Sequence, residues 1–376
     1  MISSIELRNF KTFISQEVGL NYLTIFTGLN GMGKSSFIQS LLLLRQSELQ
    51  GKLNEKGGLA LNGELTTIGV GKDVFAVEAY NDIISINIKF KQNNYIKCTF
   101  AYDPVSDIQN MLSYEISGNK DEMCVFNNNF QYLHAERLSP ERDLFPASTS
   151  NVKNGILGKN GQYTVHYIAE NQRKPISIKP LKHDNSKTDI LLENIECWLS
   201  EISPGVRITA TFFPELNSSK LSYKFTVGDE TSSEFKPSNV GFGITYVLPV
   251  ITAILISEPG DLIIIENPES HVHPNGQAAL AVLFCIAAQH GVQLIIETHS
   301  DHIINGTLIS INSRINNSKK GLDSKKVYIY FIEREENIYK SKLNSIEISE
   351  SGRISNPPNN FFDRFSKDLR QILGVK

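Results

Sequence analysis

The residues with the clearest chemical purpose form the segment Gly28–Ser36, which reads Gly-Leu-Asn-Gly-Met-Gly-Lys-Ser-Ser. Its G-x-x-x-x-G-K-[ST] spacing is that of a phosphate-binding loop, whose backbone N–H groups wrap a polyphosphate at the start of a helix. We expect Lys34 to reach the β- and γ-phosphates and the Ser35 hydroxyl to ligate Mg²⁺. The segment therefore predicts a nucleoside triphosphate site whose contacts are Asn30, Gly31, Gly33, Lys34, Ser35 and Ser36.

A carboxylate suited to the same metal follows a second apolar strand. Leu262–Ile265 is a run of aliphatic residues that ends in Glu266. A buried strand that delivers an acid at its carboxyl end is the Walker B arrangement of phosphate-loop ATPases. Glu266 is therefore predicted to hold Mg²⁺, directly or through water, beside Ser35.

Three further segments accompany these two. Asn9-Phe10-Lys11 stands near the start, Ser238–Gly243 precedes a predicted helix, and the predicted strand Gln293–Glu297 leads to His299. In this order the set resembles the ATP-binding-cassette (ABC) type ATPase heads of the SMC, RecF and OLD (overcoming lysogenization defect) class. The resemblance covers roughly residues 1–50 and 235–310, and it implies ATP as the nucleotide.

The resemblance also implies roles for two of these segments. His299 corresponds to a switch histidine that contacts the γ-phosphate or the attacking water. Ser238–Gly243 corresponds to the signature motif, which in this class meets the γ-phosphate on the other subunit. The signature contacts implied are Ser238, Asn239, Gly241 and Gly243, although the motif departs from the usual Leu-Ser-Gly-Gly-Gln. A homodimer closed around ATP–Mg²⁺ is the expected assembly, with a higher oligomer left open.

The general base is the least determined assignment. Most cassette ATPases carry an acid directly after the Walker B acid, but Asn267 stands there and the next carboxylate is Glu269. Either Glu266 or Glu269 polarises the water, or hydrolysis is slow and ATP acts mainly as a clamp. Because a positioned base contributes about 10²–10⁴-fold in rate, this choice separates a working ATPase from a slow one. The catalytic candidates are Glu266, Glu269 and His299.

Several other polar residues are weaker candidates. His271 and His273 are spaced to suggest a metal, but we assign them to the loop after the Walker B strand. Arg137 has two equally supported interpretations, a contact with the nucleotide or dimer face and a surface salt bridge. Gln39 and Arg45 lie on the helix after the phosphate loop.

The elements that must position these residues follow from the hydrophobic pattern. The last third alternates strand and helix, which favours a parallel sheet with helices on its faces. With the resemblance, the expected fold is an α/β P-loop NTPase of ABC-ATPase type, with a mixed central sheet, an antiparallel β subdomain and a helical signature lobe. Period-two alternation predicts strands at 74–80, 84–90 and 95–100, while 103–130 is expected to be a loop and 140–185 a mobile segment.

The predicted organisation is a head over residues 1–320, followed by C-terminal strands and a closing helix over 321–376. Within the head, 1–135 is the Walker A lobe with the β subdomain, 136–240 an insertion leading to the signature, and 241–320 the half with Glu266 and His299. The closing helix would place Phe362, Phe365, Leu369 and Ile372 on one side. This C-terminal stretch resembles a short module found on uncharacterised prokaryotic ATPases of the class.

Composition narrows the cellular setting. The formal net charge is −3, which gives no global basic footprint for nucleic acid. The four cysteines include no C-x-x-C pair, which favours a reducing cytosol. No signal peptide or membrane span is recognisable, so we expect a cytoplasmic protein that does not contact a membrane.

Two parts of related proteins are missing from the pattern. No sustained heptads separate Lys34 from Glu266, so no coiled-coil arm is expected, and the stretch after His299 is too short for a Toprim nuclease. The resulting hypothesis is an ATPase that gates a separate effector or nuclease subunit, in prokaryotic antiphage defence or DNA-damage response, with double-stranded DNA as a candidate ligand. Two alternatives stay open: a slow ATP-dependent scaffold that sequesters an effector without DNA, and a RecF-like repair mediator.

Overall fold

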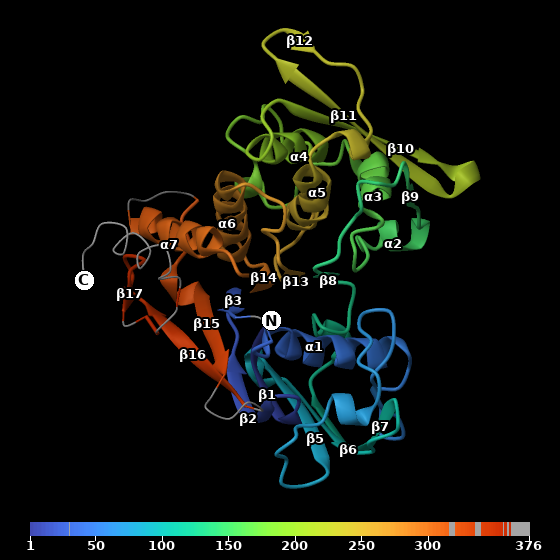
Figure 1. The fold of residues 1–376 in the computed structure, drawn as a ribbon, viewed down its shortest axis with the longest axis vertical. Helices are drawn as coiled ribbons and strands as arrows, with labels where there is room; N and C mark the ends of the chain where they lie inside the picture. Colours follow the sequence, from blue (N-terminus) through green and yellow to red (C-terminus); the bar gives the residue numbers. More distant parts are fainter. Residues whose placement is uncertain (30, 316–319, 335–339, 356, 359–360, 362–376) are drawn as a thin grey trace.

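A mixed β-sheet at the centre of the molecule carries the nucleotide motifs (Figure 1). The computed structural model describes residues 1–29, 31–315, 320–334, 340–355, 357–358 and 361. Within them the sheet has the order β17-β16-β15-β3-β14-β13-β8. Its strands are β3 (Leu23–Gly28), β8 (Phe130–Leu133), β13 (Leu262–Glu266), β14 (Gln293–Glu297), β15 (Val327–Arg334), β16 (Ser341–Ile348) and β17 (Ile354–Ser355). β8, β13, β14, β3 and β15 are parallel, as the strand–helix alternation predicted.

Helices cover both faces of this sheet, so its strands are apolar on both sides. α5 (Phe242–Leu255), α6 (Pro274–Gln289) and α7 (Asp301–Ile315) lie on one face and α1 (Lys34–Leu49) on the other (Figure 1). Ile263 and Ile265 point into the core shared with α5 and α6, whereas Leu262 and Ile264 join the core around α1. Side chains alternate across a strand, and the sheet therefore separates two hydrophobic cores.

An antiparallel sheet packs beneath α1 and forms the predicted β subdomain. Its order is β2-β1-β5-β6-β7-β4. The strands are β1 (Ile2–Phe10), β2 (Phe13–Gly19), β4 (Gly58–Ala60), β5 (Ile83–Phe90), β6 (Tyr95–Ala101) and β7 (Ile108–Ser117). The predicted strands at 84–90 and 95–100 are confirmed as β5 and β6.

α5, which begins at the predicted signature motif, belongs to a lobe of helices capped by a small sheet. The elements are β9 (Leu144–Pro146), α2 (Thr149–Lys153), α3 (Thr164–Asn171), α4 (Leu191–Ser200), β10 (Val206–Phe213), β11 (Ser218–Val227) and β12 (Glu230–Thr231). β10 and β11 pair as an antiparallel hairpin. The α4 side chains Leu191, Ile195, Trp198 and Leu199 are buried and belong to the core of this lobe.

Three local predictions were wrong. Residues 74–80, predicted to be a strand, form turns with one isolated bridge, Phe10 to Phe75, and Val77 and Tyr80 are exposed. The expected loop 103–130 contains β7, a strand with many exposed residues. Segment 140–185, predicted to be mobile, contains α2 and α3, with Val165 and Ile168 fully buried. Short buried elements in an Asn- and Gly-rich stretch give too weak a periodicity to detect.

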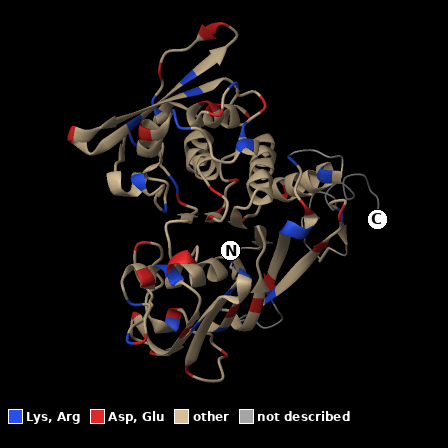
Figure 2. Ribbon diagram, turned by 180° about the vertical axis from the view of Figure 1, so that it is seen from behind, with Lys and Arg blue, Asp and Glu red and all other residues tan. Residues whose placement is uncertain are grey.

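The C-terminal strands complete the same central sheet, because β15 pairs with β3. The predicted closing helix with Phe362, Phe365, Leu369 and Ile372 falls outside the described residues. Acidic and basic residues are interspersed over both lobes (Figure 2). Within the described ranges, no helix has both the length and the apolarity that crossing a membrane requires.

Candidate nucleotide-binding site

The predicted phosphate loop connects β3 to α1, at the carboxyl edge of the parallel strands. Gly31 and Gly33 have φ angles of 73° and 96°, a region that glycine adopts without strain. A Cβ on Gly33 would also lie 2.7 Å from Thr12 Oγ1, so the position has no room for a side chain. Asn30, the first predicted contact, falls outside the described residues. Ser35 is exposed and Ser36 half-buried on the first turn of α1.

The Lys34 ammonium is held at the loop itself. Its Nζ donates to the carbonyl oxygens of Gly28 (2.9 Å) and Leu29 (2.7 Å). Burial lowers the pKa of Lys34, and the charges of Glu297 and Glu269 oppose that shift. The Lys34 ammonium therefore lies at the loop, where the phosphates of a nucleotide could replace the two carbonyl oxygens as its partners.

Two glutamates end neighbouring parallel strands at the same level. Glu266 of β13 is in register with Glu297 of β14. Ser35 Oγ donates to Glu297 Oε1 at 3.1 Å. Burial, followed by the charge of Glu266, raises the pKa of Glu297 to about 7, while Lys34 acts in the opposite direction. The hydroxyl predicted to bind Mg²⁺ thus contacts Glu297, a residue that the sequence analysis had not selected.

Glu266 is fixed by residues in β8 and directly after it. The Tyr132 hydroxyl donates to its Oε1 at 2.9 Å and the Ala135 backbone N–H to its Oε2 at 3.4 Å. His134 Nε2 is 3.7 Å from the same carboxylate. A hollow of about 330 Å³ lies here, lined by Ser35, Gln39, Leu65, Thr66, Thr67, Tyr132, His134, Lys159 and Glu266. It opens directly beside the phosphate loop.

The segment after Glu266 turns sharply and positions His299. Asn267 has a φ of 43°, and its N–H donates to the Glu297 carbonyl at 2.8 Å. Both carboxylate oxygens of Glu269 accept hydrogen bonds, from Thr298 Oγ1 (2.8 Å) and from His299 N (2.7 Å). Partial desolvation and then the charge of Lys34 lower the pKa of His299, and a hydrogen bond with the Gly28 backbone opposes them. Glu269 thus orients the strand end that presents His299 at the loop.

The predicted signature residues surround the amino terminus of α5. Ser238, Asn239 and Gly241 are exposed, and Phe242 is 51% exposed. Gly241 is the N-cap, and no side-chain hydrogen bond caps the helix. A Cβ on Gly243 would lie 2.3 Å from the His271 carbonyl oxygen, so glycine permits α5 to approach the loop after β13. The uncapped amino terminus is suited to an anion.

Arg137 links these two parts of the site. It is 6% exposed, and its guanidinium donates to the carbonyl oxygens of Glu266 and of Asn267 (3.1 Å for the latter). The guanidinium carbon also lies 4.9 Å from the centroid of the Tyr246 ring on α5. Burial lowers the pKa of Arg137 to about 10. The surface salt-bridge interpretation of Arg137 is therefore wrong: this cation braces the backbone after β13.

The other weak candidates lie around the site rather than in it. His271 packs against Phe242 and Tyr246, and the His273 ring accepts from Asn275 N at the start of α6, so neither is part of a metal centre among the described residues. Gln39 lines the hollow and accepts a hydrogen bond from Lys11. Arg45 is buried over the Phe130 ring, in the core around α1.

Sequence reasoning missed Tyr132, His134 and Glu297. Glu297 had a usable signal, because it ends an apolar strand just as Glu266 does. Tyr132 and His134 had none, since only the pairing of β8 with β13 brings them to Glu266.

The residues present fit a nucleotide-bound Mg²⁺ better than an all-protein metal site. In the described part of the chain, no group of three or more His, Cys, Asp or Glu residues could hold a metal ion. Mg²⁺ in such sites takes one or two carboxylates and completes its shell with water and phosphate oxygens. Ser35, Glu266 and Glu297 supply that kind of partial set, and Glu297 Oε2 is buried without a hydrogen-bond partner among the residues described.

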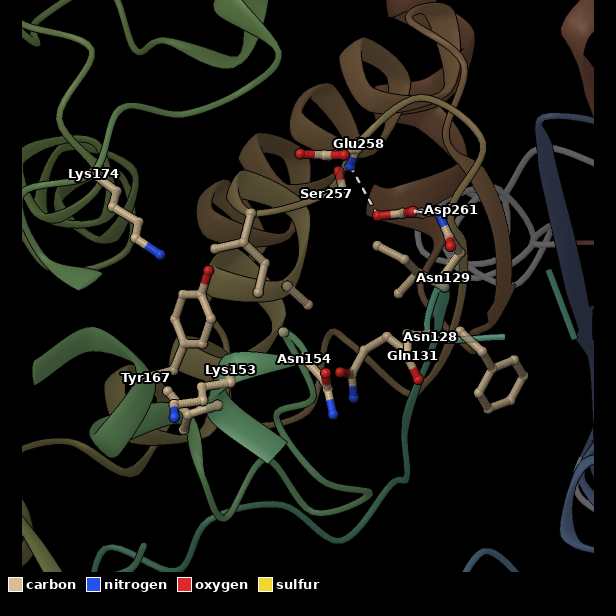
Figure 3. A pocket seen from close by; sticks show the side chains of 16 residues that line it. Asn128, Asn129, Gln131, Lys153, Asn154, Tyr167, Lys174, Ser257, Glu258 and Asp261 are labelled. Carbon is tan, nitrogen blue, oxygen red and sulfur yellow. Dashed lines mark hydrogen bonds between the residues drawn. The ribbon is translucent and has the colours of Figure 1, made fainter. Parts of the chain in front are cut away.

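A different hollow, of about 300 Å³, lies at the opposite edge of the sheet, where β8 and β13 begin (Figure 3). Asp261 there accepts from Glu258 N at 2.8 Å and from Asn129 Nδ2 at 2.7 Å. The bond from Asn129 joins the start of β8 to that of β13, and the bond from Glu258 closes the turn before β13. The hollow has none of the motif residues and is separate from the nucleotide site.

Comparison with known proteins agrees with this geometry. The family described as an AAA ATPase domain matches residues 1–197, more than half of the chain. A family described as "AAA domain, putative AbiEii toxin, Type IV TA system" matches residues 150–305, and a family of unknown function, DUF3696, matches 322–372. No curated protein matches the chain.

Solved structures show the same fold at low identity. An SMC head bound to the C-winged helix domain of ScpA superposes with a TM-score of 0.56 and 15% identity, over 92% of this chain and 98% of that one. An SMC head from Pyrococcus furiosus, with an extended coiled coil and bound to the C-terminal domain of ScpA, gives 0.51 and 12%, over 99% of both chains. The predicted fold class is thereby confirmed. The chain belongs to the AAA ATPase domain family and has the fold of the SMC heads.

Proposed function

We propose that two copies of this ATPase close around ATP–Mg²⁺, that hydrolysis reopens them, and that the change of state gates a separate effector. The observation that supports this most directly is the exposed, uncapped amino terminus of α5 at Ser238–Gly241. Helix termini of this kind bind phosphate, and the resemblance assigns this one to the nucleotide of a second subunit. The exposed Phe242 beside it suits a surface that becomes covered on closure.

Each residue of the proposed site has a role that follows from its position. Lys34 neutralises phosphate charge, and the carboxylates beside Ser35 orient the hydrated metal, which supplies charge neutralisation when bound. His299, presented by Glu269, faces the terminal phosphate. Arg137 keeps the backbone of Glu266 in place, because two of its N–H groups bond to that backbone. Positioning and charge neutralisation dominate phosphoryl transfer, and this set would supply both.

Mixing two inactive variants tests the shared site. Lys34→Ala removes the phosphate-binding ammonium, and Ser238→Arg blocks the signature surface. A mixed dimer contains one intact site, built from the loop of one subunit and the signature of the other. We expect each variant alone to be inactive and the mixture to regain ATP turnover. A mixture that stays inactive, although both variants fold and the wild type turns over ATP, would contradict the composite site.

A slow, clamp-like ATPase is the second candidate, and the geometry around Glu269 favours it. Asn267 offers no carboxylate, and both oxygens of Glu269 are already bonded to Thr298 and His299. This version predicts ATP-dependent dimers with very slow turnover. Turnover that survives Glu269→Gln but not Glu266→Gln would remove Glu269 as the base.

The proposed effector is a separate protein. The structurally similar SMC heads were solved with ScpA domains bound. We infer that this chain also binds a protein partner. We also infer a role in antiphage defence or DNA repair. Lys and Arg residues are interspersed with Asp and Glu over both lobes (Figure 2), and in that view they form no extended basic stripe along which DNA could bind. If duplex DNA stimulates ATP turnover and rising salt removes that stimulation, the hypotheses in which the ATPase acts on DNA would be favoured over the scaffold.

A further inference from the structure

We propose that Glu297, at the end of β14, is a ligand of the Mg²⁺ that Ser35 holds, directly or through one water. This inference rests on the proposed ATP–Mg²⁺ binding and adds a metal-binding residue to it. It assigns part of the metal-binding role predicted for Glu266 to a residue on the neighbouring strand.

The orientation of Ser35 is the first argument. Of the two glutamates that end adjacent strands, Glu297 is the one that accepts the Ser35 hydroxyl, at 3.1 Å. Glu266 is occupied by Tyr132 and Ala135 instead. Glu297, whose carboxylate accepts the Ser35 hydroxyl, is therefore the glutamate placed to bind the same cation as Ser35.

The environment of Glu297 is the second argument. The residue is 5% exposed, and its Oε2 is buried without a hydrogen-bond partner within the described ranges. A buried carboxylate oxygen without a partner is costly, and the neighbouring Glu266 adds like-charge repulsion. A divalent cation removes both costs at once, whereas no described side chain bonds to this oxygen.

The coordination chemistry agrees with this placement. Mg²⁺ is usually held by one or two carboxylates together with substrate phosphates and several waters. Ser35 Oγ and one Glu297 oxygen would therefore be enough from the protein. The absence of a three-residue metal cluster among the described residues is consistent with an ion that arrives with the nucleotide.

The test is the Mg²⁺ dependence of ATP binding in the full chain, measured by calorimetry with Mg²⁺ and then with EDTA. Glu297→Gln keeps the shape and can still accept from Ser35, so a purely structural role would be preserved. We expect the affinity gained on adding Mg²⁺ to fall by about 10–100-fold, with the affinity in EDTA unchanged. Mn²⁺ bound with ATP should show the same loss by electron paramagnetic resonance.

Glu196→Gln is the matched control, because Glu196 is another largely buried carboxylate, on α4, bonded to Arg207 and to Ile208 N. It should behave as wild type. Glu297→Asp, which keeps the charge, should retain part of the Mg²⁺ dependence and serves if the glutamine variant does not fold. An unchanged Mg²⁺ dependence in folded Glu297→Gln would overturn the proposal. Wild type that binds no ATP in either buffer would refute the proposed function instead.

Discussion

Replacing Arg137 by methionine should destabilise the molecule strongly, and the size of the loss can be worked out from its contacts. The guanidinium makes two charge-assisted hydrogen bonds, to the carbonyls of Glu266 and Asn267, and one cation–π contact with Tyr246. Hydrogen bonds of this kind contribute about 1.5–3 kcal/mol each, and a desolvated cation–π contact about 2 kcal/mol. Burying the charge costs several kcal/mol in return. The net loss for Arg137→Met should be about 3 kcal/mol.

Urea unfolding in EDTA, without nucleotide, measures this loss free of ligand linkage. Arg137→Lys is the matched control: it keeps the charge but presents a point donor instead of a planar fork, so we expect about half the loss. Turnover should fall in both variants, because the backbone that carries Glu266 is less well held. A methionine variant that unfolds within about 1 kcal/mol of wild type would refute the brace, since two carbonyls deprived of a buried donor cost more than that.

Three further expectations follow from described contacts. Gly243→Ala forces a methyl group against the His271 carbonyl and should cost about 1–3 kcal/mol in urea unfolding; wild-type stability would contradict the close approach. His166 is 1% exposed, and burial lowers its pKa, so stability should fall as the pH drops below the unfolded value near 6.5. His166→Gln should flatten that acid-side slope between pH 7.5 and pH 5, and an identical slope would exclude His166 as its source. Trp198→Phe removes the indole N–H that donates to the Leu181 carbonyl oxygen (2.9 Å) and should lower the free energy of unfolding by about 1–3 kcal/mol, with unfolding followed by circular dichroism. An unchanged unfolding midpoint would count against that bond.

The strands and helices that the sequence predicted well are the long, periodic ones around the motifs. The helix after the phosphate loop and the strands ending in Glu266 and Glu297 stand where expected, because uniformly apolar runs bounded by glycine or acid leave few alternatives. β7 was missed because few of its residues are buried, so its sequence lacks the apolar alternation that marks a strand. Residues 74–80 show the opposite failure, since alternation alone does not provide a partner strand.

The candidate site shows the same division, between features within one segment, which the sequence predicts, and contacts between distant segments, which it does not. Local spacing identified the phosphate loop, and Glu266 could be placed because it ends its strand. The contacts that build the candidate site join segments far apart: Tyr132 reaches Glu266 across neighbouring strands, and Ser35 on α1 reaches Glu297 on β14. No pattern within one segment contains such pairings, because sheet order determines them. Roles for the predicted site residues therefore stay predictions until the variants are measured.

The left-handed backbone at Asn267 has a consequence for protein design. Its φ of 43° lets the chain bond to the Glu297 carbonyl and reverse directly after Glu266. Asparagine tolerates this conformation well, while for most side chains it costs about 1–2 kcal/mol. Installing a glutamate there, to supply a carboxylate directly after Glu266, would strain the turn that sets the position of Glu266. An engineer who wants a faster enzyme would do better to recruit a carboxylate from another segment than to rewrite this residue.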